Sequence, residues 1–203
     1  RLLGNGEKWG ISLKYKIQPS PDGLAQAFIL SEDFLNGSPS VLILGDNIFF
    51  GNGLQKLLQD ACGKKEGATI FGYHVNHPED YGVINFTSNG VVNSLIEKPK
   101  LPKSNFAVTG LYIVDSTAPQ RAKSIKPSTR GELEITTFLE TYMKEGTLEV
   151  KKMGGGYAWL DTGTHNSMLD AANFVRTLTE RQGIQIGSPE EISHELGWTN
   201  IET

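Results

Sequence analysis

The sequence predicts an α/β fold, because short apolar runs alternate along the chain with segments of helical periodicity. The runs Val41–Leu44 and Thr69–Tyr73 are typical of strands buried on both faces. Between them, residues 54–61 place leucine and alanine at helical spacing. This order of strand, helix and strand is the one that a parallel α/β sheet requires.

Two further elements precede these. Isoleucine, leucine and tyrosine alternate with serine and lysine over residues 11–17, which predicts a half-buried strand that ends at Pro19 and Pro21. Apolar residues then recur at roughly helical spacing from Leu24 to Phe34, and we expect Asp22 to cap that helix.

The pattern changes after the second apolar run. Residues 82–86, the turn at residues 88–90 and residues 91–96 predict a β-hairpin, and residues 106–114 predict another strand. We expect this insertion, at about residues 81–114, to carry substrate contacts.

The last third of the chain returns to helices and strands. Residues 132–144 predict a helix, residues 148–153 a strand, and the three glycines at 154–156 a turn. A long helix capped by Thr164 follows, and Ser188-Pro-Glu-Glu191 is typical of a capping box with proline at the first helical position.

The sequence predicts one domain over residues 1–203, because no internal repeat or linker divides it. The C-terminal region of this domain, at about residues 164–203, is predicted to be helical. The chain starts at Arg1 with neither an initiator methionine nor the charged-then-apolar pattern of a signal peptide. We therefore interpret Arg1 as a truncation point.

Composition excludes several classes of partner. Lysine plus arginine number 19 against 23 aspartates plus glutamates, a net charge of -4, so no excess of positive charge is available for a nucleic acid. Cys62 is the single cysteine, which excludes an internal disulfide framework and a cysteine-based zinc cluster and suits a reducing cytoplasm. No apolar run approaches the length of a membrane span, so we expect no membrane partner.

Two aspartates stand where apolar strands end. Asp46 follows the first run after one glycine, and Asp161 ends the run that begins at Tyr157. Open α/β sheets bind ligands at such strand ends, and Mg²⁺ uses one or two carboxylates together with substrate phosphates. We therefore predict that Asp46 and Asp161 hold Mg²⁺, although each aspartate alone is equally well explained as the cap of the next element.

Other strand ends carry groups suited to a nucleotide and a sugar phosphate. The amide of Gln18 can donate to and accept from a pyrimidine edge, and Gly23 allows a close backbone approach. Glu97 offers a carboxylate to sugar hydroxyls, and Lys98 offers an ammonium to a phosphate. Simpler explanations remain open, namely a turn for Gln18 to Gly23 and a solvated charge pair for Glu97 and Lys98.

An aromatic face and open backbone near the same edge suit a sugar. They come from Tyr81, Gly82 and the segment from Val108 to Tyr112, although core packing explains Tyr112 equally well. The four histidines are assigned no role. His74 and His77 lack the carboxylate and cysteine neighbours of a zinc site, and His165 and His194 are expected to be solvated on helices. The three glycines at 154–156 lack the spacing of a dinucleotide-binding loop, which disfavours a dehydrogenase.

Seven motifs in this order resemble those of glucose-1-phosphate thymidylyltransferases, and the resemblance covers essentially the whole chain. The motifs are Gln18-Pro-Ser-Pro-Asp-Gly-Leu-Ala-Gln-Ala27, Leu44-Gly-Asp-Asn47, Tyr81-Gly82, Glu97-Lys-Pro99, Val108-Thr-Gly-Leu-Tyr112, Arg130-Gly-Glu-Leu-Glu-Ile-Thr136 and Trp159-Leu-Asp-Thr-Gly163. The resemblance implies a Rossmann-like mixed sheet of the nucleotide-diphospho-sugar transferase type.

The resemblance also implies a role for each site residue. Gln18 and Gly23 would recognise the thymine base, Asp46 and Asp161 would hold the catalytic Mg²⁺ beside the nucleotide, and Lys98 would bind the sugar phosphate as a third catalytic group. Contacts with the glucose moiety are implied for Tyr81, Gly82, Glu97, Val108, Tyr112 and Trp159.

The implied reaction is an in-line attack of glucose-1-phosphate on the α-phosphorus of dTTP, which gives dTDP-glucose and pyrophosphate without a covalent enzyme intermediate. The resemblance further implies a cytoplasmic homotetramer, end-product inhibition by dTDP-rhamnose and a role in cell-surface polysaccharide synthesis. Two alternatives remain, a related enzyme that uses UTP and a non-catalytic module that binds a sugar nucleotide. Related uridylyltransferases carry Gly-Leu-Gly-His where this chain has Gly23-Leu-Ala-Gln26, which favours dTTP.

The chain departs from the family pattern at two places. The family begins with a strand and a Gly-rich loop, bearing an arginine and followed by a lysine, that cradle the triphosphate, and no segment of this chain matches them. We therefore expect the fold without its first strand and loop, and weakened nucleotide binding. The family usually has an acidic residue where this chain has Thr137, a difference that we expect to be minor.

Overall fold

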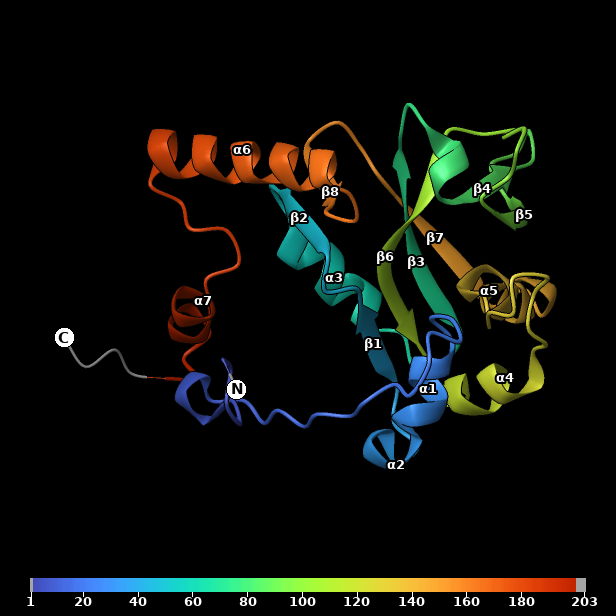
Figure 1. The fold of residues 1–203 in the computed structure, drawn as a ribbon, viewed down its shortest axis with the longest axis horizontal. Coiled ribbons are helices and arrows are strands. Elements are labelled where there is room, and N and C mark those ends of the chain that lie inside the picture. Colours follow the sequence, from blue (N-terminus) through green and yellow to red (C-terminus); the bar gives the residue numbers. More distant parts are fainter. Residues whose placement is uncertain (1, 200–203) are drawn as a thin grey trace. The chain divides into compact units, whose positions relative to one another are not determined.

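The computed structural model describes residues 2–199 as a mixed α/β protein (Figure 1). Contacts along the chain divide it into two compact units. Gln18–Asp161 form the larger unit, and Arg1–Ile17 with Thr162–Thr203 form the smaller one. All the predicted site residues belong to the larger unit, and the prediction of one domain over residues 1–203 stays a prediction.

A six-stranded sheet forms the centre of the larger unit. Its strands follow the spatial order β5-β4-β6-β3-β7, and β1 pairs with the end of β6. The bounds of these strands are β1 Ser40–Ile43, β3 Ala68–His74, β4 Gly82–Phe86, β5 Val92–Glu97, β6 Phe106–Val114 and β7 Leu148–Met153. Among the described ladders of this sheet, only the pairing of β3 with β7 is parallel. The prediction of a parallel sheet from the alternating pattern is therefore wrong, and the prediction of a mixed sheet is confirmed.

A separate two-stranded ribbon lies beside this sheet. It pairs β2, Asn47–Gly51, with β8, Tyr157–Asp161, in antiparallel register. The strand predicted at residues 157–161 is therefore confirmed. Asp161 ends β8, and Asp46 lies in the turn between β1 and the start of β2.

Helices cover both faces of the larger unit's sheet (Figure 1). On one face α1, α4 and α5 pack on a core that includes Phe28, Tyr112 and Phe138. On the other face α3 and the ribbon pack on Phe71 and Leu111. The helices of this unit are α1 Gln26–Leu30, α2 Glu32–Leu35, α3 Leu54–Cys62, α4 Ala118–Ser124 and α5 Ile135–Lys144, with a 3-10 helix at Pro78–Asp80.

Three predicted elements differ from the structure. Residues 11–17 form no strand, because in the described part of the chain no other strand pairs with them, and Tyr15 and Ile17 are exposed. The helix after Asp22 begins only at Gln26, whose side-chain amide donates to the Asp22 carboxylate, so Asp22 is not its cap. The helix predicted over residues 132–144 also begins late, at Ile135.

The first apolar run forms a strand, but it is not buried on both faces. Val41 and Ile43 on β1 are 51% and 56% exposed, while Leu42 between them packs on the core. Apolar character alone could not tell a one-sided edge strand from a central one, since both need apolar residues.

The smaller unit contains a 3-10 helix at Glu7–Trp9, α6 at His165–Gln182 and α7 at Pro189–Glu195. Thr164 caps α6, as predicted, through a reciprocal pair of bonds with Ser167. The Ser188 hydroxyl caps α7 by accepting from the Glu191 N–H, which is one of the two bonds of the predicted capping box. Residues 200–203 of the predicted helical region lie outside the described residues. Within residues 2–199, none of the helices has the length and apolar character needed to span a membrane.

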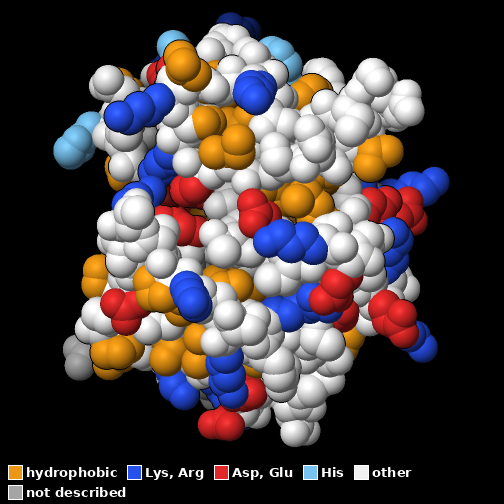
Figure 2. Space-filling model, turned by 90° about the vertical axis from the view of Figure 1, so that its right-hand side faces the viewer, with side chains coloured by type: hydrophobic (Ala, Val, Ile, Leu, Met, Phe, Trp, Pro, Cys, Tyr) orange, Lys and Arg blue, Asp and Glu red, His pale blue; other side chains and the backbone are white. Residues whose placement is uncertain are grey.

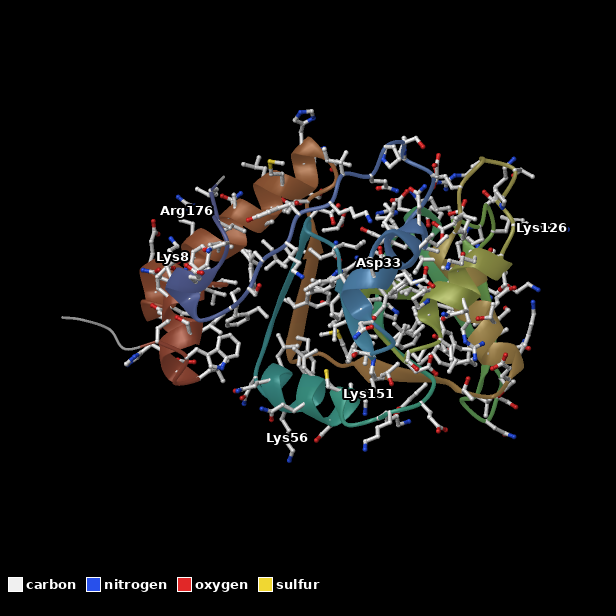
Figure 3. The ribbon with its side chains drawn as sticks, turned by 90° about the horizontal axis from the view of Figure 1, so that it is seen from below. Lys8, Asp33, Lys56, Lys126, Lys151 and Arg176 are labelled. Carbon is white, nitrogen blue, oxygen red and sulfur yellow. The ribbon has the colours of Figure 1, made fainter. Side chains whose placement is uncertain are left out.

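Charged side chains of both signs are interspersed on the face that Figure 2 shows, which carries α4, α5 and the β4–β5 hairpin. The side chains of Lys56 on α3 and Lys126 after α4 point outward and are exposed (Figure 3). The face in Figure 2 therefore carries charged groups of both signs and, among the described residues, no region of one sign alone.

Candidate active site

The ribbon brings the two predicted metal-binding aspartates to the same end. Its register places Asn47 opposite Asp161, and Asp46 directly precedes Asn47. The start of β2 and the end of β8 lie at the same end of an antiparallel ribbon, so both aspartates stand at that end. Asp46 is exposed and Asp161 half-buried, so both carboxylates remain open to a ligand.

The Asn47 side chain joins three parts of this end. Its Oδ1 accepts hydrogen bonds from the Trp159 indole at 2.6 Å and from the Gly110 backbone N–H at 3.1 Å. Its Nδ2 donates to Oδ1 of Asp46 at 2.7 Å. One amide therefore contacts the aspartate, the ribbon tryptophan and strand β6.

Tyr81 holds the second aspartate. Its hydroxyl donates to Oδ1 of Asp161 at 2.9 Å, and its ring centroid lies 5.2 Å from that of Trp159. Burial raises the pKa of the Tyr81 phenol, and the Asp161 carboxylate raises it further. Tyr81 therefore stays protonated and keeps donating to Asp161 at neutral pH.

A second carboxylate pocket lies where β4, β5, β6 and α5 meet. Gly82 and Glu97 face each other across β4 and β5, and the Thr136 hydroxyl donates to Oε2 of Glu97 at 3.2 Å. A methyl group placed on Gly82 would lie 2.8 Å from Cγ2 of Thr136 and 3.6 Å from Cγ2 of Val108. The structure thus brings Gly82, Glu97 and Val108 together, as a shared sugar-binding surface requires.

The electrostatic surroundings of Glu97 differ from those of an exposed glutamate. Burial raises the pKa of the Glu97 carboxyl, and the charge of Glu134 raises it further. The hydrogen bond from Thr136 and the charges of Lys98 and Arg130 act in the opposite direction. Glu97 is therefore a partly desolvated acceptor, which binds a hydroxyl donor more strongly than an acceptor in water does.

Lys98 and Tyr112 occupy different positions around this pocket. Lys98 is exposed, has a left-handed backbone with φ of 40°, and donates its N–H to the Tyr81 carbonyl oxygen. Tyr112 is buried in the core, and burial raises its pKa, with smaller contributions from the charges of Glu97 and Asp46. Tyr112 therefore lies within electrostatic reach of both carboxylate groups of the site.

The loop of Gln18 and Gly23 lies against the start of α5. Gln18 donates to the Gln26 amide oxygen at 2.6 Å, so within the described residues its amide bonds to the start of α1 and to its own loop, and not to β2 or β8. Gly23 has a φ of 103°, and a Cβ there would lie 2.5 Å from both the N and the O of Leu133. The close approach at Gly23 is thus to the chain's own backbone.

Three residues of this site were given no role by the sequence. Asn47, Glu134 and Thr136 stand within the motifs, but only the folded structure shows what their side chains contact. The one available signal was the position of Asn47 directly after a predicted metal ligand. The positions of Glu134 near Glu97 and of the Thr136 methyl group beside Gly82 depend on how α5 packs on the sheet, which no local sequence pattern encodes.

The donor set can be compared with the needs of a metal. Within residues 2–199 no group of three or more histidine, cysteine, aspartate or glutamate side chains could hold an ion. A pair of carboxylates at one strand end is instead what Mg²⁺ uses when phosphates and water supply its other ligands. Asp46 and Asp161 fit that arrangement.

The chain matches one protein family over most of its length. The family model described as nucleotidyl transferase matches residues 1–177. A glucose-1-phosphate thymidylyltransferase from Xanthomonas campestris pv. campestris is 53% identical over 201 residues, which are 99% of this chain and 68% of that protein. One from Mycobacterium tuberculosis is 46% identical over 202 residues, 100% of this chain and 70% of that protein.

Solved structures show the same fold. A Bacillus anthracis protein described as a glucose-1-phosphate thymidylyltransferase, in complex with sucrose, has a TM-score of 0.79 and 39% identity over 92% of this chain and 72% of that one. A UDP-glucose pyrophosphorylase complexed with UDP-glucose has a TM-score of 0.70 at 24% identity, over 81% of this chain and 66% of that one. The second likeness concerns the fold alone.

Proposed function

This chain belongs to the nucleotidyl transferase family as a glucose-1-phosphate thymidylyltransferase, and from that premise we propose that the ribbon end and the Glu97 pocket are the two halves of its active site. Enzymes of this name join a thymidylyl group from dTTP to glucose-1-phosphate, with release of pyrophosphate. The observation that carries the assignment is the meeting of Asp46, Asp161, Tyr81 and Trp159 at one end of the ribbon.

The ribbon end is the half that binds phosphates. The family generally needs a divalent metal ion, and we infer that it is Mg²⁺, held by Asp46 and Asp161. The ion would neutralise charge on the phosphates of the nucleotide. Tyr81 donates to Oδ1 of Asp161 and Asn47 donates to Oδ1 of Asp46, so each carboxylate is oriented by a neighbouring side chain.

The Glu97 pocket is the half that binds the sugar. Glu97 accepts from glucose hydroxyls beside Val108, and the bare α-carbon of Gly82 makes room for the Thr136 methyl group that packs against Glu97. The aromatic side chains of Tyr81 and Trp159 form one wall. Lys98 is exposed at the rim, where its ammonium can reach the sugar phosphate. With both substrates aligned, an oxygen of the sugar phosphate attacks the α-phosphorus in line.

Gln18 and Gly23 are proposed to recognise the base. Gln18 is exposed, and its amide can exchange the bond to Gln26 for the donor and acceptor of a pyrimidine edge. Gly23 supports this indirectly, because its left-handed backbone and contact with Leu133 set the shape of the loop. Homotetrameric assembly, cytoplasmic location and inhibition by dTDP-rhamnose stay predictions.

The test is pyrophosphate release from glucose-1-phosphate with dTTP or UTP, with and without Mg²⁺. We expect Mg²⁺-dependent release, with a higher kcat/KM for dTTP. Faster release with UTP would assign the chain to the related uridylyl enzymes. Binding of dTDP-glucose without any pyrophosphate release, both by this chain and by one that carries the family's Gly-rich loop, would contradict the enzyme assignment and support the binding module.

A further inference from the structure

The pairing of strand β6 with β3 is irregular where β6 meets Asn47 of the ribbon. Its register with β3 pairs Tyr112 with Ile70 and Val108 with Gly72, so residues 109–111 stand opposite the single residue Phe71. A bulge of this kind turns backbone groups out of the ladder and leaves them in need of other partners. The N–H of Gly110, in the middle of the bulge, donates to Asn47 instead.

The Asn47 amide has only one orientation that satisfies its neighbours. Two donors, the Trp159 indole and the Gly110 N–H, meet its oxygen, while the acceptor Asp46 meets its nitrogen. An amide oxygen accepts two hydrogen bonds, so both donors are satisfied at once. Turning the amide over would place donor against donor and acceptor against acceptor.

Gly110 is matched to this amide. A Cβ on residue 110 would lie 2.4 Å from Oδ1 of Asn47, closer than any side-chain carbon can approach. Gly110 has no left-handed backbone angle, so its lack of a side chain is needed for space and not for conformation. Strand β6 therefore admits the Asn47 amide only because residue 110 is glycine.

From this geometry we propose that Asn47 is a positioning residue that fixes the Asp46 carboxylate for the metal ion. The inference rests on the proposed function, in which Asp46 binds that ion. Trp159 and the bulge of β6 hold the amide, and the amide in turn fixes Oδ1 of Asp46. Residues that orient a metal ligand in this way commonly contribute a factor of about 10 to 100 to metal affinity.

The experiment measures Mn²⁺ binding by electron paramagnetic resonance in the presence of dTTP, at a temperature at which each variant is folded by circular dichroism. Asn47→Ala should weaken Mn²⁺ binding about 10-fold or more. Gly110→Ala should weaken it too, although residue 110 brings no group to the metal. Asn93→Ala, an exposed change on β5, serves as the control and should leave the affinity unchanged.

The double variant Asn47→Ala with Gly110→Ala separates positioning from general damage. Without the amide, the new methyl group at residue 110 no longer meets Asn47, and its next neighbour is Cδ1 of Leu44 at 2.9 Å, the movable end of a side chain. The double variant should therefore bind Mn²⁺ no more weakly than Asn47→Ala alone. Two independent structural defects would instead add. The double variant also refills part of the space left by the amide, which provides a folded protein if a single variant does not fold.

Asp46→Ala, measured in parallel, distinguishes the two levels of the argument. Loss of Mn²⁺ binding in Asp46→Ala together with wild-type affinity in Asn47→Ala would overturn the positioning role and leave the metal site intact. Unchanged binding in Asp46→Ala would overturn the metal site itself, and the role of Asn47 with it.

Discussion

The two halves of the site hold their carboxylates in different ways. At the ribbon end, Asp161 ends β8 and accepts from the Tyr81 hydroxyl, and Asp46 lies just before β2 and accepts from the Asn47 amide. In the other half, packing positions Glu97 as well. The methyl groups of Thr136 and Val108 pack against Gly82, and the hydroxyl of Thr136 donates to Glu97.

The difference has consequences for function. A carboxylate open to solvent keeps its charge at little cost and can exchange water for a metal ion and phosphates. A carboxylate in a packed pocket carries a desolvation penalty, which is reflected in the raised pKa of Glu97, but offers a sugar hydroxyl a stronger acceptor. Removing a charge should therefore have the larger effect on activity at the ribbon end, and changing the packing should also affect activity at Glu97.

The largest effect is expected from Asp161→Asn. The variant keeps the shape of the side chain and an acceptor for the Tyr81 hydroxyl, so its unfolding temperature should stay close to that of the wild type. Loss of the metal-binding charge should lower the rate of pyrophosphate release about 10²- to 10³-fold. Asp60→Asn, an exposed change on α3, is the matched control. Full Mg²⁺-dependent activity in Asp161→Asn would show that the metal lies elsewhere.

A smaller loss of activity, with a gain of stability, is expected from Glu97→Gln. Loss of a charged acceptor for a sugar hydroxyl should lower kcat/KM about 10- to 100-fold. Because folding raises the pKa of Glu97, the contribution of this group to stability is full below the ordinary glutamate pKa and is lost as the pH rises through the folded value.

The pH profile of unfolding tests this sign. Glutamine stays neutral at every pH, so Glu97→Gln should unfold at a higher temperature than the wild type at pH 7, and the two curves should converge in acid. Glu66→Gln, at an exposed position, should unfold at the same temperature as the wild type at both pH values. A variant that is less stable than the wild type at pH 7 would mean that the Glu97 charge stabilises its pocket.

The sequence predicted the elements of the larger unit well where side-chain period alone defines them. Helix α3, strands β3, β6 and β7, and the β4–β5 hairpin lie close to their predicted ranges. Strand direction was not predicted, because the period of two is the same in parallel and antiparallel ladders. Residues 11–17 were wrongly predicted to form a strand, because an alternating pattern does not reveal whether a partner strand exists.

The site was predicted at the level of motifs and not at the level of contacts. Asp46 and Asp161 stand beside the ends of apolar strands, as the sequence indicated, but a separate antiparallel ribbon brings them to one end, and not the edge of a parallel sheet. Gly23 was expected to admit a ligand, but its space is taken by the backbone of Leu133. Asn47 and Thr136 act through neighbours that are far away in the sequence, so only the tertiary structure relates them to the site.

The smallest effect, and the sharpest test of the shape-controlled half, is expected from Gly82→Ala. The added methyl group would lie 2.8 Å from Cγ2 of Thr136, which should cost about 1–3 kcal/mol of stability and raise the KM for glucose-1-phosphate about 10-fold through a displaced Glu97. Thr136→Ser removes that methyl group but keeps the hydroxyl that donates to Glu97. Gly82→Ala with Thr136→Ser should therefore recover most of the lost affinity, while Gly63→Ala, where the new Cβ would have an ordinary contact at 3.6 Å, should change neither KM nor stability appreciably. If the double variant keeps the raised KM, Gly82 contacts the sugar directly. Glucose-1-phosphate binding is then limited by the room for the substrate and not by the packing of the pocket.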